Sequence, residues 1–126
     1  MKLKSAIISV LFSTTIFAHG MNKPGPHGGY IKMPSSYHVE LLNSGSNLKI
    51  YLLDINFKNP TTKNSSVTVE FSGVISYKNL CEKIEDHFEC PKPKNSLEGY
   101  NKIIIYSERE AIKASSAQYA LPLKFE

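Results

Sequence analysis

Long apolar runs are scarce in this sequence of 126 residues, and the one clear run lies within the first 18. After residue 18 no apolar run approaches the roughly 20 residues that a membrane-spanning helix needs, so we expect no membrane span in the rest of the chain. The sequence contains no G-x-S-x-G, no H-E-x-x-H and no phosphate-binding glycine loop. These absences predict that the protein is not an enzyme.

Neither sign of charge dominates the chain. Fifteen Lys and Arg residues oppose 11 Asp and Glu residues, which gives a formal net charge of +4. The basic residues are spread along the sequence and form no concentrated patch of the kind that binds a phosphate backbone. We therefore expect no nucleic-acid partner.

The first 18 residues have the pattern of an export signal. Lys2 and Lys4 supply a positive start, residues 6–17 are mostly apolar, and Ala18 is a small residue at a plausible cleavage site. We predict that residues 1–18 are a signal peptide and that residues 19–126 form one periplasmic or secreted domain. Cleavage there would leave His19 as the first residue, with an amine and an imidazole that can chelate a metal ion together.

Only two cysteines occur, Cys81 and Cys90, and both lie in the part of the chain that we expect to be exported. An oxidising compartment favours their pairing, so we predict one structural disulfide. The alternative is a thiolate metal site, but the spacing matches neither the C-x-x-C of zinc sites nor a redox motif.

Alternation of apolar and polar residues with a period of two dominates the chain after residue 28 and is typical of β-strands with one buried face. Turn-forming clusters separate the alternating segments. The pattern predicts an all-β fold, an antiparallel β-sandwich of about seven strands that is immunoglobulin-like or cupredoxin-like in outline. The expected strands are 29–33, 36–41, 48–52, 67–71, 74–79, 102–106 and 119–125.

Helix content should be small. Ser107 and Glu110 could form a capping box that opens one helical turn through Ile112, and residues 79–84 could hold another turn. Pro122 lacks a backbone N–H, so the last strand should lie at the edge of a sheet.

A hairpin that turns at Pro34-Ser35 would place His38 opposite Ile31 and Glu40 opposite Gly29, on the face away from the core. An imidazole and a carboxylate two residues apart on one strand can reach a single ion. The alternative is an exposed polar sheet surface that carries an ordinary His and Glu.

The preceding segment, residues 24–29, reads Pro-Gly-Pro-His-Gly-Gly and is unsuited to a helix or strand. It is either a structural turn or a loop that brings His27 toward the same ion. The resulting candidate ligands suit copper or zinc, and they are His19, His27, His38 and Glu40.

The strings His27-Gly28-Gly29, His38-Val39-Glu40-Leu41 and Tyr51-Leu52-Leu53-Asp54 together resemble a small exported bacterial domain. That domain occurs alone and near the start of heavy-metal efflux adaptor proteins, and it carries an H-G-G, H-x-E-L, Y-L-L-D pattern. The resemblance covers residues 25–54 and implies a periplasmic, efflux-associated role in metal handling that involves His27, His38 and Glu40.

A looser analogy links the chain to copper-binding sandwiches in which an N-terminal His is completed by a later D-x-H; the corresponding string here is Glu85-Asp86-His87. Two functions follow as expectations. One is a periplasmic protein that sequesters copper or zinc or passes the ion on. The other is a metal-free exported interaction module that binds an efflux component or another envelope protein, through a sandwich face or the Lys-rich segment 92–102.

Overall fold

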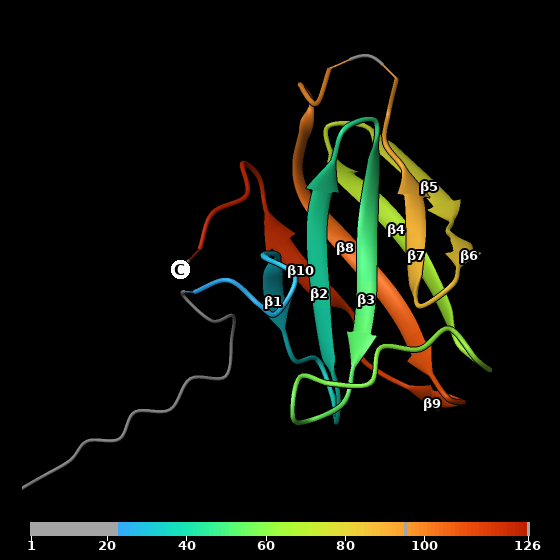
Figure 1. The fold of residues 1–126 in the computed structure, drawn as a ribbon. Coiled ribbons are helices and arrows are strands. Elements are labelled where there is room, and N and C mark those ends of the chain that lie inside the picture. Colours follow the sequence, from blue (N-terminus) through green and yellow to red (C-terminus); the bar gives the residue numbers. More distant parts are fainter. Residues whose placement is uncertain (1–22, 95, 126) are drawn as a thin grey trace, which may run out of the picture.

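The computed structural model describes residues 23–94 and 96–125, which form ten β-strands and no helix (Figure 1). The predicted signal peptide and His19 lie outside these residues. The strands are β1 (Tyr30–Lys32), β2 (His38–Ser44), β3 (Asn47–Leu53), β4 (Ser66–Gly73), β5 (Ser76–Leu80), β6 (Glu82–Ile84), β7 (His87–Pro91), β8 (Tyr100–Arg109), β9 (Ile112–Lys113) and β10 (Ala117–Ala120).

The strands form two antiparallel sheets that pack face to face, so the predicted sandwich is confirmed (Figure 1). Sheet A has the order β1-β2-β3-β7-β6. Sheet B has the order β10-β8-β4-β5, with β9 paired to β8. The three strands beyond the expected seven are short ones that carry little alternation, namely β6, β7 and β9.

The core lies between the sheets and consists of the apolar residues of each alternating segment. Val39, Leu41 and Ile50 from sheet A and Val69 and Phe71 from sheet B are fully buried. Their polar neighbours in sequence therefore point to the outer faces of the sandwich, as period-two alternation requires.

The two predicted helical turns are wrong. The segment 79–84 is extended, since it holds the end of β5 and all of β6. Glu110, expected in a capping box, instead lies with Ala111 in a tight turn between β8 and β9, where both residues have positive φ (50° and 69°). Such a two-residue turn matches the twist of a hairpin, and Ser107 is used differently, because its hydroxyl bonds the Tyr37 hydroxyl at 2.9 Å inside the core.

The last strand is shorter than expected, since β10 ends at Ala120, before Pro122. It does lie at an edge of sheet B, as predicted. Because Pro122 cannot donate to a ladder, the chain leaves the sheet just before it.

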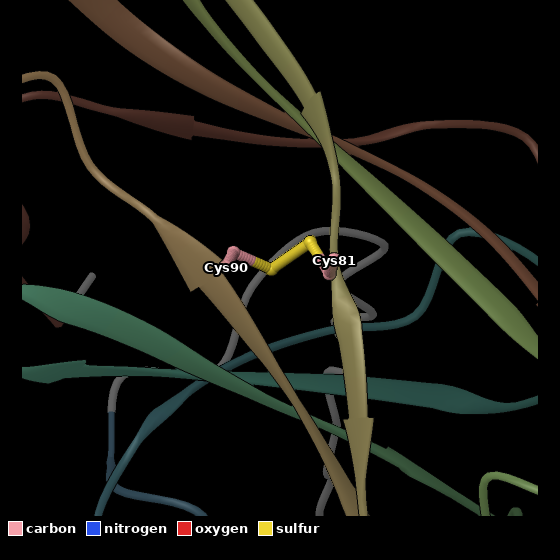
Figure 2. Close-up of a disulfide and its surroundings, with 2 residues drawn as sticks. All are labelled: Cys81 and Cys90. Atoms are coloured by element: carbon pink, nitrogen blue, oxygen red, sulfur yellow. A yellow bond between two sulfur atoms is a disulfide. The ribbon is translucent and has the colours of Figure 1, made fainter.

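The predicted disulfide between Cys81 and Cys90 is present (Figure 2). Cys81 stands between β5 and β6, where one continuous segment passes from sheet B to sheet A. Its backbone N–H donates to Val67 of β4 at 2.9 Å, while its sulfur bonds to β7. The bridge therefore fastens the two sheets together at the point where the chain changes sheets.

Candidate functional site

A loop of residues 25–29 covers part of the outer face of sheet A and is anchored by one carboxylate. The side chain of Glu40 is fully buried, and its Oε2 accepts the backbone N–H groups of His27 at 2.8 Å and Gly29 at 2.9 Å. Its Oε1 accepts a third hydrogen bond, 2.7 Å long, from Nδ1 of His27. Both oxygens of this carboxylate are thus engaged by the loop.

The glycines of the loop are required by close contacts. A Cβ at Gly29 would stand 2.7 Å from the carbonyl oxygen of Leu41, and a Cβ at Gly25 would stand 2.8 Å from Oε2 of Glu40. Gly28 has φ +85°, a conformation that side chains disfavour. The glycine-rich sequence therefore serves to seat this loop directly on the sheet.

The ring of His27 stacks on Tyr51 of β3, with centroids 3.7 Å apart and planes within 4°. Tyr51 in turn lies 5.2 Å from the ring of His87 on β7. His87 has Asp86 at 3.2 Å from Nδ1 and Glu89 at 3.3 Å from Nε2. Burial raises the pKa of the Tyr51 hydroxyl, and the charges of Asp86, Glu40 and Glu89 add to the shift.

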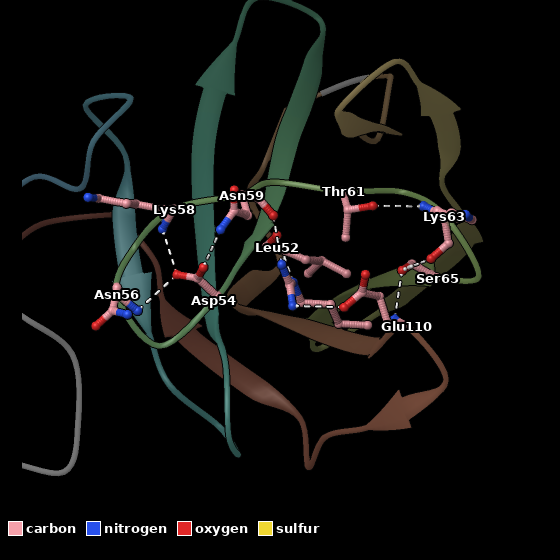
Figure 3. A network of polar contacts seen from close by, with 10 residues as sticks. Leu52, Asp54, Asn56, Lys58, Asn59, Thr61, Lys63, Ser65 and Glu110 are labelled. Carbon is pink, nitrogen blue, oxygen red and sulfur yellow. Dashed lines mark hydrogen bonds and ion pairs between the residues drawn. The ribbon is translucent and has the colours of Figure 1, made fainter.

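A second loop, residues 54–59, covers the other part of this face (Figure 3). The Asp54 carboxylate accepts the backbone N–H groups of Asn56 and Lys58 and the side-chain amide of Asn59. The N–H of Lys58, followed by the Asn59 amide, lowers the pKa of Asp54. The loop holds Phe57 at φ 63°, and its ring stacks on His38 with centroids 3.9 Å apart.

Of the four predicted ligands, the structure brings together only His27 and Glu40. His38 lies under Phe57, with Nδ1 3.1 Å from the carbonyl oxygen of Asp54. His19 lies outside the described residues. Within residues 23–94 and 96–125 no group of three or more His, Cys, Asp or Glu side chains is placed to hold a metal ion.

The predicted hairpin register is wrong by two residues, since Ile31 pairs with Glu40, not with His38. The reversal between β1 and β2 takes residues 33–37, more than a tight turn at Pro34-Ser35 provides. A shift of two residues leaves each side chain on the same face of the sheet, so His38 and Glu40 still point to the outer face, as expected. The exposed-surface alternative is also wrong, since Glu40 and His38 are 0% and 6% exposed.

Sequence reasoning missed the aromatic contacts of this face. Phe57 and Tyr51 were not candidates, and His87 entered only by analogy. Reading 87–91 as a strand would have placed His87 beside Tyr51, because β7 pairs antiparallel with β3 from Ile50↔Phe88 onward.

Among residues 23–94 and 96–125, no loop anchored in this way covers the outer face of sheet B. Glu70 and Thr68 on the central strand β4 are partly exposed, and Tyr106 on β8 is 38% exposed. The Tyr106 hydroxyl donates to Glu70 at 2.6 Å, and this hydrogen bond is the main cause of the raised pKa of Tyr106. Nζ of Lys78 lies 4.7 Å from the centre of the same ring.

This bare face ends at the edge strand β5. Three large apolar side chains of residues 74–80 are strongly exposed: Val74 is 91% exposed, Leu80 72% and Ile75 53%. The other edge strands of the described residues, β1, β6, β9 and β10, have two to four residues, whereas β5 has five and contains no proline. Proteins usually protect a sheet edge by shortness, proline or charge, and β5 has only Lys78.

No family model, no curated protein and no solved structure matches this chain. In the described part of the chain no helix is long and apolar enough to cross a membrane.

Proposed function

We propose that the protein is an exported interaction module that binds a segment of another envelope protein along the edge strand β5. One observation supports this best. Among the described residues, the longest free sheet edge and the two most exposed large apolar side chains, Val74 and Leu80, lie in the same segment, residues 74–80. Contiguous exposed apolar surface at an edge is typical of protein-binding sites.

The register of β5 defines how such a segment would attach. Cys81 donates its N–H to Val67, and hydrogen-bonded positions alternate along an antiparallel pair. Asn79 therefore directs its backbone groups toward β4, while Lys78 and Leu80 direct theirs outward. The side chains of Lys78 and Leu80 lie on the outer face of sheet B, since they pair with Glu70 and Thr68.

A matched pair of proline variants tests this mode of binding. Lys78→Pro removes an outward N–H and should abolish partner binding with little loss of stability, whereas Asn79→Pro removes an N–H of the β4–β5 ladder and should mainly destabilise the fold. Binding is measured by placing a photo-crosslinking amino acid at Leu80 in cells that export the protein. Gln118, on the opposite edge strand, is the control position.

We expect one dominant crosslinked partner from position 80, none from position 118, and loss of the adduct in Lys78→Pro. Equal adducts from both positions, or an adduct that persists in a folded Lys78→Pro variant, would contradict strand addition at β5.

Metal binding is the second candidate, supported by the contact between His27 and Glu40. A carboxylate that accepts Nδ1–H fixes the other ring nitrogen, Nε2, as the one with a free lone pair, an arrangement common at metal-binding histidines. The His27 side chain is 32% exposed. In this reading Glu40 orients the ligand and does not bind copper or zinc itself.

Titration of the processed protein with Cu(II) and Zn(II) tests this second candidate. His27→Ala should remove binding, and His38→Ala should leave it unchanged, because His38 is held beneath Phe57. Binding that depends on His38 would contradict the assignment.

A further inference from the structure

The sandwich contains a cavity of about 290 Å³ at the end where β2 turns into β3. Its floor is the core itself, formed by Leu48 of β3, Phe71 of β4 and Ile103 of β8, each at most 1% exposed. The cavity is thus a half-open groove that lies over this end of the core. No residue of β5 lines it, so it is separate from the proposed edge site.

The walls of this cavity are apolar and its rim is polar. Tyr30, Leu97, Leu121 and Leu123 form the walls. The strand β10 ends at Ala120, and the chain beyond it crosses this end as an irregular segment. The N–H of Leu121 donates to the carbonyl oxygen of Asn101 there. The space is at the lower limit of ligand pockets, which are about 300–1,000 Å³.

One cation stands at the rim. Nζ of Lys92 donates to the side-chain oxygen of Asn43 at 2.6 Å. Among the described residues no carboxylate forms a salt bridge with Lys92, so the hydrogen bond to the neutral Asn43 amide leaves its positive charge uncompensated. An ammonium beside an apolar cavity is complementary to a ligand with an apolar body and an anionic end.

We propose that this cavity binds a small anionic amphiphile: a single aliphatic chain lies over the core floor against Leu97, Leu121 and Leu123, and its charged headgroup accepts hydrogen bonds from Lys92. A polar body would lose its water contacts against the apolar floor. The ligand chemistry follows from this cavity alone and does not depend on the edge-strand proposal.

Decanoate is a suitable probe, with decanol and decylamine as matched ligands of the same chain length. Binding is followed by NMR shifts of the methyl groups of Leu48, Ile103 and Leu121, below the micelle concentration. We expect decanoate to bind most tightly, decanol about tenfold more weakly and decylamine more weakly still, because only decanoate forms a charge-assisted hydrogen bond with Lys92.

Two variants and one control complete the test. Lys92→Gln should weaken decanoate about tenfold and leave decanol unchanged. Lys94→Gln alters a neighbouring lysine that does not line the cavity and should change neither affinity. Leu121→Trp should fill the space and remove binding of both ligands.

The proposal would be overturned by three results: no methyl shift with decanoate, equal affinity for decanoate and decylamine, or unchanged decanoate affinity in Lys92→Gln. Because Lys92 lies at the rim, this variant keeps the test valid even where Leu121→Trp does not fold.

Discussion

The two outer faces of the sandwich differ in what covers them. Glu40 and Glu70 occupy comparable places, each pointing outward from an inner strand of its sheet. Glu40 is fully buried beneath a loop that it anchors, whereas Glu70 is partly exposed and, within the described part of the chain, accepts hydrogen bonds from the hydroxyls of Tyr106 and Ser76 alone. Similar alternation in two strands therefore produced opposite surroundings, because loops, not strands, decide whether an outer face is available to a partner.

Glu40→Ala should have the largest effect on stability. It would leave the buried N–H of Gly29 and that of His27 without their acceptor, at a cost of about 4 kcal/mol in the free energy of unfolding. Glu70→Ala is the matched control and should cost less than about 1 kcal/mol. Urea unfolding of both variants measures the difference, and equal losses would show that the two faces are not distinct.

Replacing Cys81 and Cys90 together by serine should cost about 2.5 to 3 kcal/mol, since the bridge closes a short loop in the unfolded chain. Protection of backbone amides from hydrogen exchange should fall most in β5 and β6, because the segment that joins them loses its covalent bond to β7. A uniform loss of protection over both sheets would contradict this account of the bridge.

A core tyrosine and a surface tyrosine should respond differently to alkali. Burial raises the pKa of Tyr119 well above its ordinary value, with a smaller contribution from the charge of Glu40. Its proton is bound more tightly in the folded state, so its contribution to stability is complete below about pH 10 and is lost as the pH rises toward the folded pKa.

Tyr119→Phe should therefore cost about 1 kcal/mol at pH 7, where hydrogen bonds to Tyr30 and Val39 are lost, and should flatten the fall in stability above pH 10. Tyr106→Phe, on the bare face of sheet B, should change this alkaline slope less. A steeper slope in Tyr119→Phe would reverse the assignment.

Leu80→Ser should have the smallest effect on stability, within about 0.5 kcal/mol, because its side chain is 72% exposed. With the photo-crosslinking amino acid placed at Val74, which is 91% exposed, Leu80→Ser should nevertheless weaken crosslinking to a partner at β5. A loss of stability above 1 kcal/mol would show that Leu80 serves the fold and not an interface.

The sandwich and the outward direction of His38 and Glu40 could be predicted because alternation is recorded in neighbouring residues. The disulfide could be predicted because the chain has only two cysteines, both in the part expected to be exported. The burial of Glu40 could not, since it depends on a loop at Gly25–Gly29 that meets β2 only in three dimensions. The error at Glu110 has the same origin: its capping pattern is local, but pairing of β8 with β4 over residues 66–73 outweighs it.

The position of Cys81 also determines how the molecule would carry mechanical load. A partner strand that pulls on β5 transmits tension to β4 through hydrogen bonds and to β7 through the sulfur atoms at the same time. After reduction only the short β6–β7 ladder would still hold this segment to sheet A. The disulfide therefore adds a covalent path for load to a hydrogen-bonded one.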